Sequence, residues 1–247
     1  MTGIFDSGAG GLSVYREIVR LLPSESYVYF SDNAHCPYGE KSQEYITDRA
    51  RWITRHLMDE GCGVIVVACN TATAAAIATL RKEFDMPFIG MEPAVKPAAL
   101  GTRSGVIGVL ATAGTLRAGK YLDTKEKYTD GIKVVEHVGQ GFVELVESGV
   151  LEGPEAEKVV RASVEPLLAQ GADRIVLGCT HYPFLRPVIE KVCGPGVEVI
   201  DPAPAAARHL VDVMKEKGLP MCSEGGFSMK LEASGDDSTL RRLYSLL

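Results

Sequence analysis

The chain has 247 residues, of which 46% are hydrophobic and 23% charged, an ordinary balance for a globular protein with a buried core. Its net charge is −6 and it has no long run of Lys or Arg, so nucleic acid is not an expected partner. No apolar run approaches the roughly 20 residues of a membrane span, and residues 1–6 lack signal-peptide features. We therefore expect a cytoplasmic protein, without membrane contact, whose six cysteines are reduced thiols. No Cys-x-x-Cys spacing occurs, so no metal site is expected.

Short apolar runs alternate with helix-like patterns along nearly the whole chain. Most of these runs are continuously apolar, which is typical of parallel strands covered on both faces. Between them lie amphipathic segments, such as the one with Ile46, Ala50, Ile53 and Leu57 on one face and Gly61 as its stop signal. This alternation predicts an α/β fold with mostly parallel sheets, in which ligands bind at the carboxyl ends of the strands. The expected strands are 3–5, 27–30, 63–68, 87–89, 105–110, 132–135, 174–178 and 197–200.

The two halves of the chain resemble each other. A strand running into a small-residue turn occurs at 3–8 and again at 108–113, and an apolar strand that ends in a thiol occurs at 64–71 and at 174–181. The repeat predicts two pseudo-symmetric α/β lobes, each a mostly parallel sheet flanked by helices, with the active site in the cleft between them. We expect the first lobe to span 1–95, with 205–247 returning to it, and the second to span 96–204.

Cys69 and Cys179 are the strongest candidates for chemistry. A cysteine that ends a core strand is often only a small buried residue. However, polar residues follow both cysteines, and a helix expected to begin near Ala74 would direct its N-terminal amides at Cys69. Such amides favour the thiolate form of cysteine and bind carboxylates. His181, more often structural when alone, becomes a plausible proton partner beside Cys179.

The first strand ends at Asp6 and Ser7, before the glycine-rich stretch 8–11. Asp6 in this position is commonly a cap of the following turn. The stretch partly matches the dinucleotide fingerprint, but Ser13 stands where the third glycine belongs, and a tight turn is a sufficient explanation. Tyr38 and Gly39 follow the second strand, in a loop expected to overhang the same strand ends.

Four motifs together closely resemble glutamate racemase, and more loosely the wider aspartate/glutamate racemase superfamily. The resemblance spans nearly the whole chain in order and implies a cofactor-independent enzyme that interconverts L- and D-glutamate for bacterial peptidoglycan. It also implies two pseudo-symmetric lobes and leaves a homodimer open. The motifs are Phe5-Asp6-Ser7-Gly8-Ala9-Gly10-Gly11-Leu12, Pro37-Tyr38-Gly39, Ala68-Cys69-Asn70-Thr71-Ala72-Thr73 and Leu177-Gly178-Cys179-Thr180-His181-Tyr182-Pro183.

The resemblance implies a role for each matching residue. Cys69 and Cys179 would be the two acid/base residues, with Asp6 assisting Cys69 and His181 assisting Cys179. An acidic residue would assist Cys179 as well; the context favours Glu147 over Glu144, although 139–143 departs from the Cys-Pro pair of many members. Positions matching the substrate pocket are Ser7, Pro37, Tyr38, Gly39, Asn70, Thr71, Thr112, Thr115 and Thr180.

Four other functions compete with this one. A one-cysteine decarboxylase of the same superfamily is disfavoured by the two matched cysteines. Whether the substrate is aspartate rather than glutamate depends on the size of the substrate pocket. A two-lobed protein that only binds an amino acid would have no need of two thiols in its cleft. An NAD-dependent oxidoreductase would be stabilised by NAD in a thermal shift assay.

Overall fold

The computed structural model describes residues 1–219 and 227–247, which form two compact units. The first unit comprises Met1–Met91 and Ala203–Leu247, and the second comprises Glu92–Pro202. These limits lie a few residues from the boundaries expected at 95 and 205. Within the described residues, no helix combines the length and the apolar character needed to span a membrane.

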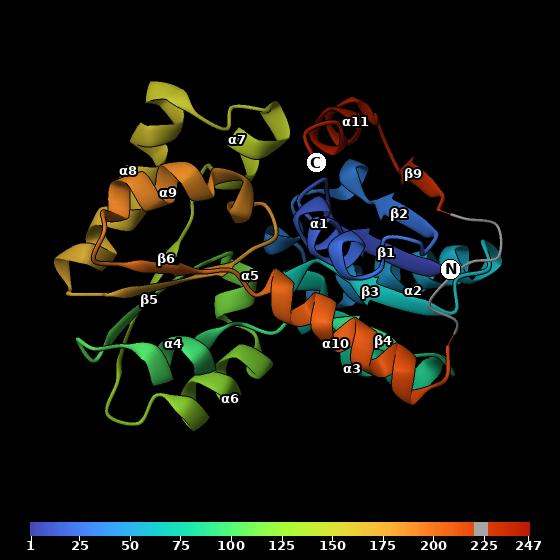
Figure 1. Cartoon of the computed structure of the whole chain (residues 1–247), viewed down its shortest axis with the longest axis horizontal. Helices are drawn as coiled ribbons and strands as arrows, with labels where there is room; N and C mark the ends of the chain where they lie inside the picture. The colour runs from blue at the N-terminus through green and yellow to red at the C-terminus, as the bar shows by residue number, and fades with distance from the viewer. Residues whose placement is uncertain (220–226) are drawn as a thin grey trace. The chain divides into compact units, whose positions relative to one another are not determined.

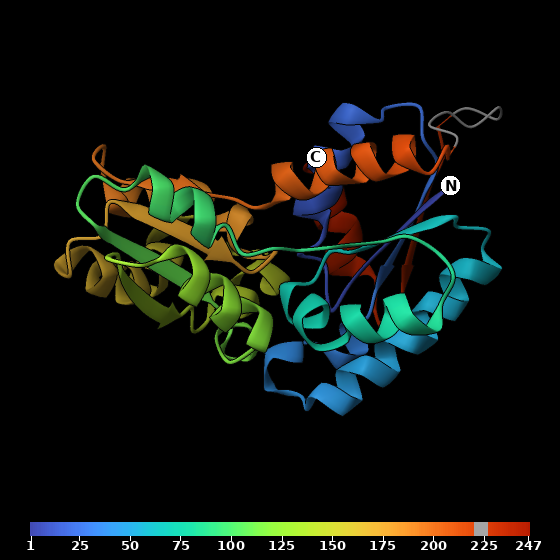
Figure 2. The same ribbon diagram turned by 90° about the horizontal axis from the view of Figure 1, so that it is seen from below.

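The first unit is built on a five-stranded, wholly parallel sheet in the order β4-β3-β1-β2-β9 (Figure 1). Helix α1 packs against α10, and α2 packs against α3. Figure 2 shows these two pairs of helices on opposite sides of the sheet. The elements of this unit are β1 (Thr2–Asp6), α1 (Leu12–Leu21), β2 (Tyr27–Ser31), η1 (Asn33–His35), η2 (Tyr38–Glu40), α2 (Gln43–Asp59), β3 (Val64–Val67), α3 (Asn70–Glu83), β4 (Phe88–Gly90), α10 (Ala203–Glu216), β9 (Met229–Ala233) and α11 (Ser238–Tyr244).

The second unit has a four-stranded parallel sheet in the order β6-β5-β7-β8. Helix α4 packs against α6, and α8 packs against α9. Its elements are α4 (Val95–Gly101), β5 (Val106–Ala111), α5 (Ala113–Leu116), α6 (Gly119–Tyr128), β6 (Lys133–Val138), α7 (Phe142–Ser148), α8 (Gly153–Ala169), β7 (Arg174–Gly178), η3 (Tyr182–Leu185), α9 (Arg186–Cys193) and β8 (Glu198–Ile200).

The two sheets share one topology. In each, the first strand of the unit is central, its second strand pairs on one side and its third on the other, and the fourth extends beyond the third. The expected α/β fold, with two parallel sheets flanked by helices, is therefore confirmed. The strand β9, which the sequence pattern did not predict, is added beside β2 in the first unit.

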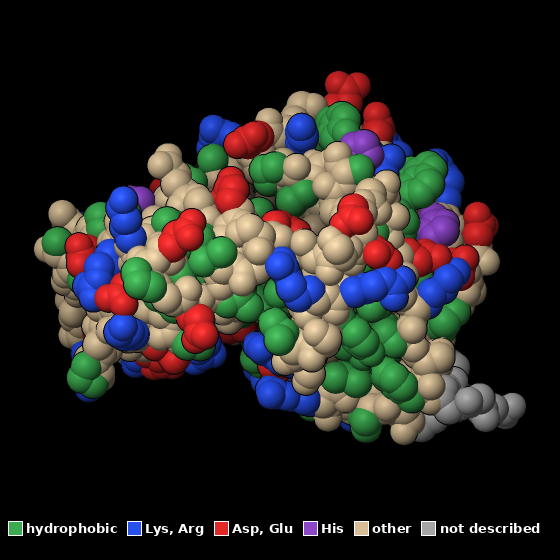
Figure 3. All heavy atoms as spheres, turned by 90° about the horizontal axis from the view of Figure 1, so that it is seen from above, with side chains coloured by type: hydrophobic (Ala, Val, Ile, Leu, Met, Phe, Trp, Pro, Cys, Tyr) green, Lys and Arg blue, Asp and Glu red, His purple; other side chains and the backbone are tan. Residues whose placement is uncertain are grey.

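Apolar periodicity explains how the helices cover their sheets. Phe5, Ile65 and Val67 project from alternate positions of the first sheet into one core with Ile53 and Leu57 of α2. Helix α2 stops where predicted, because Gly61 takes the positive φ of 84° that a helix stop favours. On the face drawn in Figure 3, Lys and Arg side chains are interspersed with Asp and Glu.

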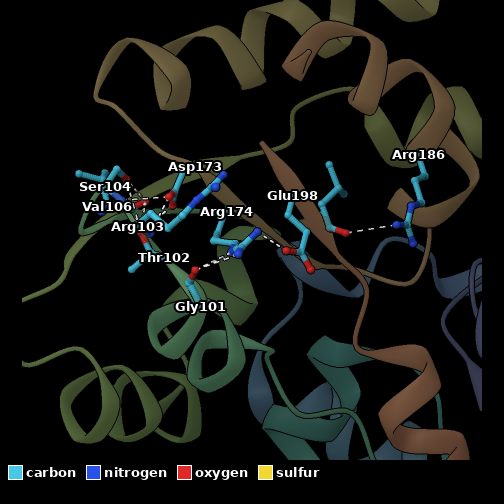
Figure 4. Close-up of polar contacts among 10 residues, drawn as sticks. Gly101, Thr102, Arg103, Ser104, Val106, Asp173, Arg174, Arg186 and Glu198 are labelled. Carbon is cyan, nitrogen blue, oxygen red and sulfur yellow. Dashed lines mark hydrogen bonds and ion pairs between the residues drawn. The ribbon is translucent and has the colours of Figure 1, made fainter. Parts of the chain in front are cut away.

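A hydrogen-bonded turn fixes the amino-terminal edge of the second sheet (Figure 4). The Asp173 carboxylate accepts hydrogen bonds from the Thr102 hydroxyl at 2.6 Å and from the backbone N–H groups of Arg103 and Ser104 at 2.7 and 2.9 Å. Arg174 donates to the carbonyl of Gly101 and pairs with a carboxylate on β8. Burial opposes ionisation, but the hydrogen bonds outweigh it and lower the pKa of Asp173 to about 2.

We expect Asp173→Asn to lower the free energy of unfolding by about 1 kcal/mol at pH 7, a modest loss because the site is partly solvated. The pKa of Asp173 is depressed from 3.8 to about 2, so its contribution is complete above pH 3.8 and is lost as the pH falls through about 2. Denaturant unfolding at pH 7 and pH 3 should show the difference between wild type and variant shrinking in acid. Asp130→Asn, at an exposed carboxylate of the same unit, is the control. A difference independent of pH would contradict the charge-based explanation.

A groove with a volume of about 640 Å³ lies at this same edge. It is lined by both charge types, including Arg103, Arg174, Lys191 and Glu198. Because Arg174 and Glu198 begin β7 and β8, the groove lies at the amino ends of the strands, whereas both candidate thiols follow carboxyl ends.

Candidate active site

Cys69 lies at the carboxyl edge of the first sheet, beside the end of β1. The β1–β3 register pairs Phe5 with Val67, which brings the two residues that follow these strands, Ser7 and Cys69, next to each other. The Cys69 Sγ lies 3.7 Å from the Ser7 Oγ, and both residues are buried. Two of the predicted site residues therefore meet because neighbouring parallel strands end together.

Cys69 itself caps helix α3. Its Sγ accepts a hydrogen bond from the N–H of Ala72 at 3.4 Å, so the helix begins at Asn70. The helix start expected near Ala74 is wrong. Because the Cys69 side chain caps the helix, the residues expected to form a polar turn are already helical. Amide donors and the positive end of the helix dipole favour a thiolate at this position.

Asp6 is completely buried and organises the glycine-rich turn after β1. Its Oδ2 accepts from the N–H groups of Gly8 at 3.4 Å and Gly11 at 2.9 Å. A Cβ on Gly11 would lie 2.7 Å from the hydroxyl oxygen of Tyr29, so only glycine fits there. The structure thus shows the capping role of Asp6, at the carboxyl end of the strand beside Cys69.

The first turn of α3 holds a buried side chain with unused hydrogen-bonding capacity. Asn70 is only 4% exposed, and neither its amide oxygen nor its amide nitrogen has a partner among residues 1–219 and 227–247. Leaving a buried amide unpaired is costly, so a polar ligand is the natural partner. Thr71, the next residue, is also buried.

Pro37, Tyr38 and Gly39 follow β2, and the structure makes this segment more than a surface turn. The Tyr38 ring is 1% exposed and belongs to the same core cluster as Cys69. Its hydroxyl donates to Asp32 at 2.5 Å, and Asp32 pairs with Arg49. Neither Asp32 nor Arg49 was predicted as a site residue, since only the fold brings them under this segment.

In the second unit, Cys179 follows β7 and begins a chain of polar groups. The Cys179 Sγ lies 3.8 Å from His181 Nδ1, and His181 Nε2 lies 2.6 Å from Glu147 Oε1. His181 is 2% exposed. This arrangement can pass a proton between the thiol and the imidazole, while the carboxylate orients the ring and stabilises its charged form. Of the two acids considered, Glu147 contacts the histidine and Glu144 is exposed.

The departure from the family pattern at 139–143 has a local explanation. A Cβ on Gly139 would lie 2.6 Å from the Tyr182 hydroxyl oxygen, and Gly141 takes a φ of 80° just before α7. These glycines allow the close packing that starts the helix carrying Glu147. Burial and then the nearby Cys179 raise the pKa of Tyr182 well above its ordinary value, so Tyr182 stays neutral.

The remaining predicted positions of the second unit lie at the same strand ends. Thr112 follows β5, and its Oγ1 caps α5 by accepting from the N–H of Thr115 at 3.2 Å. The two threonine hydroxyl oxygens lie 3.0 Å apart. Thr180, between Cys179 and His181, is 4% exposed.

The other cysteines have different surroundings. Burial raises the pKa of Cys62 to about 12 and that of Cys193 to about 11, so both remain thiols at neutral pH. Cys36 is half-buried directly before Pro37, and Cys222 lies outside the described residues. Neither Cys62 nor Cys193 is suited to act as a base.

The chain is similar to known proteins in both sequence and structure. Residues 4–210 match the family described as Asp/Glu/Hydantoin racemase. A glutamate racemase of Ectopseudomonas mendocina is 46% identical over 99% of this chain and 93% of its own length. The solved glutamate racemase RacE1 of Bacillus anthracis matches with a TM-score of 0.89 at 33% identity, over 100% of this chain and 92% of that one.

A further solved structure is the Escherichia coli glutamate racemase in complex with L-glutamate and the activator UDP-MurNAc-Ala. It matches with a TM-score of 0.87 at 31% identity, over 99% of this chain and 94% of that one. The chain belongs to the Asp/Glu/Hydantoin racemase family. Within that family its similarity lies with the glutamate racemases, and it is an enzyme that racemises an amino acid.

Proposed function

We propose that the chain interconverts L- and D-glutamate without a cofactor, with Cys69 and Cys179 acting on opposite faces of the substrate. The observation that carries this proposal is the equivalence of the two thiols. Each follows the third strand of its unit, at the carboxyl edge of a sheet with the same topology. We infer glutamate as the substrate because the glutamate racemases of Ectopseudomonas mendocina and Bacillus anthracis are 46% and 33% identical to this chain over nearly its whole length.

The chemistry requires two groups of this kind. Removing the α-proton of an amino acid produces a poorly stabilised carbanion, and inversion requires protonation on the opposite face. A single base would tend to return the proton to the face from which it came. One thiolate and one thiol can exchange roles for the two directions, and an unperturbed thiol, with a pKa of about 8.5, needs only modest help near neutral pH.

Neighbouring groups have distinct tasks in this proposal. Asp6 assists Cys69, while His181 and Glu147 take up and return the proton of Cys179. The amide of Asn70, which has no partner within the described part of the chain, and the hydroxyl groups nearby bind the substrate and stabilise developing negative charge. The proposed substrate-binding residues are Ser7, Pro37, Tyr38, Gly39, Asn70, Thr71, Thr112, Thr115 and Thr180.

Proton exchange in D₂O tests the proposal directly. We expect the protein, incubated with L-glutamate and L-aspartate together and no added cofactor, to remove the glutamate α-proton signal and leave that of aspartate. A Cys69→Ser/Cys179→Ser double variant is the control for adventitious exchange. Loss of only the aspartate signal would mean that the substrate is aspartate and not glutamate. If folded protein changes neither signal, the proposed reaction is wrong.

We also propose that the D-glutamate serves peptidoglycan synthesis. Support comes from the Escherichia coli relative, whose activator, UDP-MurNAc-Ala, carries the muramic acid sugar of the bacterial cell wall. Expression of the chain should restore growth of a bacterium that depends on added D-glutamate. Failure of an enzymatically active, well-expressed chain to do so would contradict this role.

A further inference from the structure

An ion pair between a buried carboxylate and a half-buried arginine adjoins the segment that carries Pro37, Tyr38 and Gly39. Asp32 directly follows β2 and is completely buried. Arg49, in the middle of α2, donates from Nε to Asp32 Oδ2 at 2.9 Å and from Nη2 to Oδ1 at 2.7 Å. This two-point geometry fixes both side chains, because the planar guanidinium matches the carboxylate.

The Tyr38 hydroxyl donates the third hydrogen bond to this carboxylate, to Oδ2 at 2.5 Å. Burial opposes ionisation of Asp32, but the hydrogen bonds from Arg49 and Tyr38 prevail and lower the pKa of Asp32. Burial and then the charge of Asp32 raise the pKa of Tyr38, so its hydroxyl remains a donor. The carboxylate therefore stays charged and the phenol neutral under ordinary conditions, which favours a strong, directional hydrogen bond.

Tyr38 connects the ion pair to the thiol. Its ring shares a core cluster with Cys69 and Ala72, the residue whose N–H binds the Cys69 sulfur. The 3-10 helix that Tyr38 begins packs against α3. The position of the Pro37–Gly39 segment relative to Cys69 thus depends on where the Tyr38 hydroxyl is held.

Arg49 also contacts an aromatic ring of its own helix. Its guanidinium lies over the Trp52 ring at 4.9 Å, and its side chain is 21% exposed. Asp32 has two further polar neighbours, His35 with Nε2 3.9 Å from Oδ1 and Ser234, a hydrogen-bond donor from the end of β9. Burying a carboxylate costs desolvation free energy, and these partners offset that cost while holding Asp32 in one position.

We propose that Asp32 and Arg49 are positioning residues for the racemase reaction: by holding the Tyr38 hydroxyl, they fix the Pro37–Gly39 segment against the first turn of α3. This inference rests on the proposed function, in which that segment lines the glutamate site. Neither residue takes part in proton transfer. Their effect is on how well the bound substrate is placed beside Cys69.

Steady-state kinetics test the proposal with Tyr38→Phe, which removes one oxygen and keeps the packed ring. We expect KM for glutamate to rise about tenfold, the effect of losing a hydrogen bond to a charged group, with a much smaller change in kcat. Asp32→Asn should give a similar rise, and the double variant should be no worse than the poorer single variant, since both break one interaction. Arg49→Met should behave like them, and Arg49→Lys should recover part of the loss.

Arg51→Met is the matched control on the same helix. Arg51 also makes a two-point ion pair, with Glu83 at 2.7 and 2.8 Å, but on the exposed surface. We expect its kinetics to match wild type. Wild-type KM in folded Tyr38→Phe and Arg49→Met, or an equal rise in KM for Arg51→Met, would overturn the proposal.

Alkylation of Cys69 separates this inference from the proposed function. Cys69 is 5% exposed, and loosening the segment should accelerate its reaction with iodoacetamide, followed by peptide mass spectrometry, in Tyr38→Phe but not in Arg51→Met. If wild type alkylates as fast as Tyr38→Phe, the segment is not held by this hydrogen bond and the proposal fails. Faster alkylation in Tyr38→Phe together with an inactive wild type would support the positioning network and refute the racemase function.

Discussion

Replacing either Cys69 or Cys179 with serine is expected to reduce glutamate racemisation by at least about a thousandfold, within the range attributed to a positioned acid or base. A serine hydroxyl is far less acidic than a thiol, so it can neither ionise near neutral pH nor donate its proton easily. Circular dichroism of the glutamate solution, started from either enantiomer, measures the rate. Equal, severe losses in both variants are expected because inversion requires both faces.

The mechanism predicts more than inactivity. Each single variant keeps one competent thiol, so it should still exchange the α-proton of one enantiomer with solvent on one face, and the two variants should favour opposite enantiomers. Cys193→Ser, which removes a thiol whose pKa is raised to about 11, is the matched control and should remain active. Full racemisation by Cys69→Ser or Cys179→Ser would falsify the two-base assignment.

His181→Asn is expected to lower kcat by about a hundredfold or more, because it removes the imidazole that we propose as the proton partner of Cys179. Glu147→Gln should cause a smaller decrease, since it leaves the imidazole in place but removes the carboxylate 2.6 Å from its Nε2. The two enantiomers have equal free energies, so kcat/KM must fall equally in both directions in every variant. Only the separate kcat and KM values can reveal which face is impaired.

Glu144→Gln provides the comparison for this second prediction. Glu144 lies one turn away on the same short helix, α7, and is exposed. We expect near-wild-type rates for Glu144→Gln and a clear loss for Glu147→Gln, measured in both directions at saturating substrate. If Glu144→Gln is the more damaging change, the acidic helper of Cys179 has been assigned to the wrong carboxylate.

Most of the fold could be predicted because buried parallel strands are short and continuously apolar. All eight expected strands exist, and β7 has the predicted limits of 174–178. Strand β9 was missed because it pairs only with β2 and alternates Met229, Leu231 and Ala233 with charged residues, a weak signal in five residues. The start of α3 was missed because a cysteine is an unusual cap, so sequence pattern placed the helix later.

In the site, as in the fold, residues that belong to a local sequence pattern could be predicted, whereas contacts between positions far apart in the sequence could not. Cys69 and Cys179 were identifiable because a thiol at the end of an apolar strand, followed by polar residues, is a local pattern. The contact between His181 and Glu147 joins positions 34 residues apart, and only the family resemblance suggested it. The network of Asp32, Tyr38 and Arg49 had no local signature, because an acid after a strand and an arginine on a helix are both common.

The chain order of the first unit has a consequence for how the protein is made. Its sheet and helix layer are completed by α10 and β9, which are synthesised only after the whole continuous second unit. At about 5–20 residues per second, residues 92–202 delay them by on the order of ten seconds. Meanwhile the outer edge of β2 and the apolar face of α1 lack their partners, and an open strand edge invites wrong pairing. A chain truncated after residue 202 would contain the whole second unit together with a first unit that lacks α10 and β9.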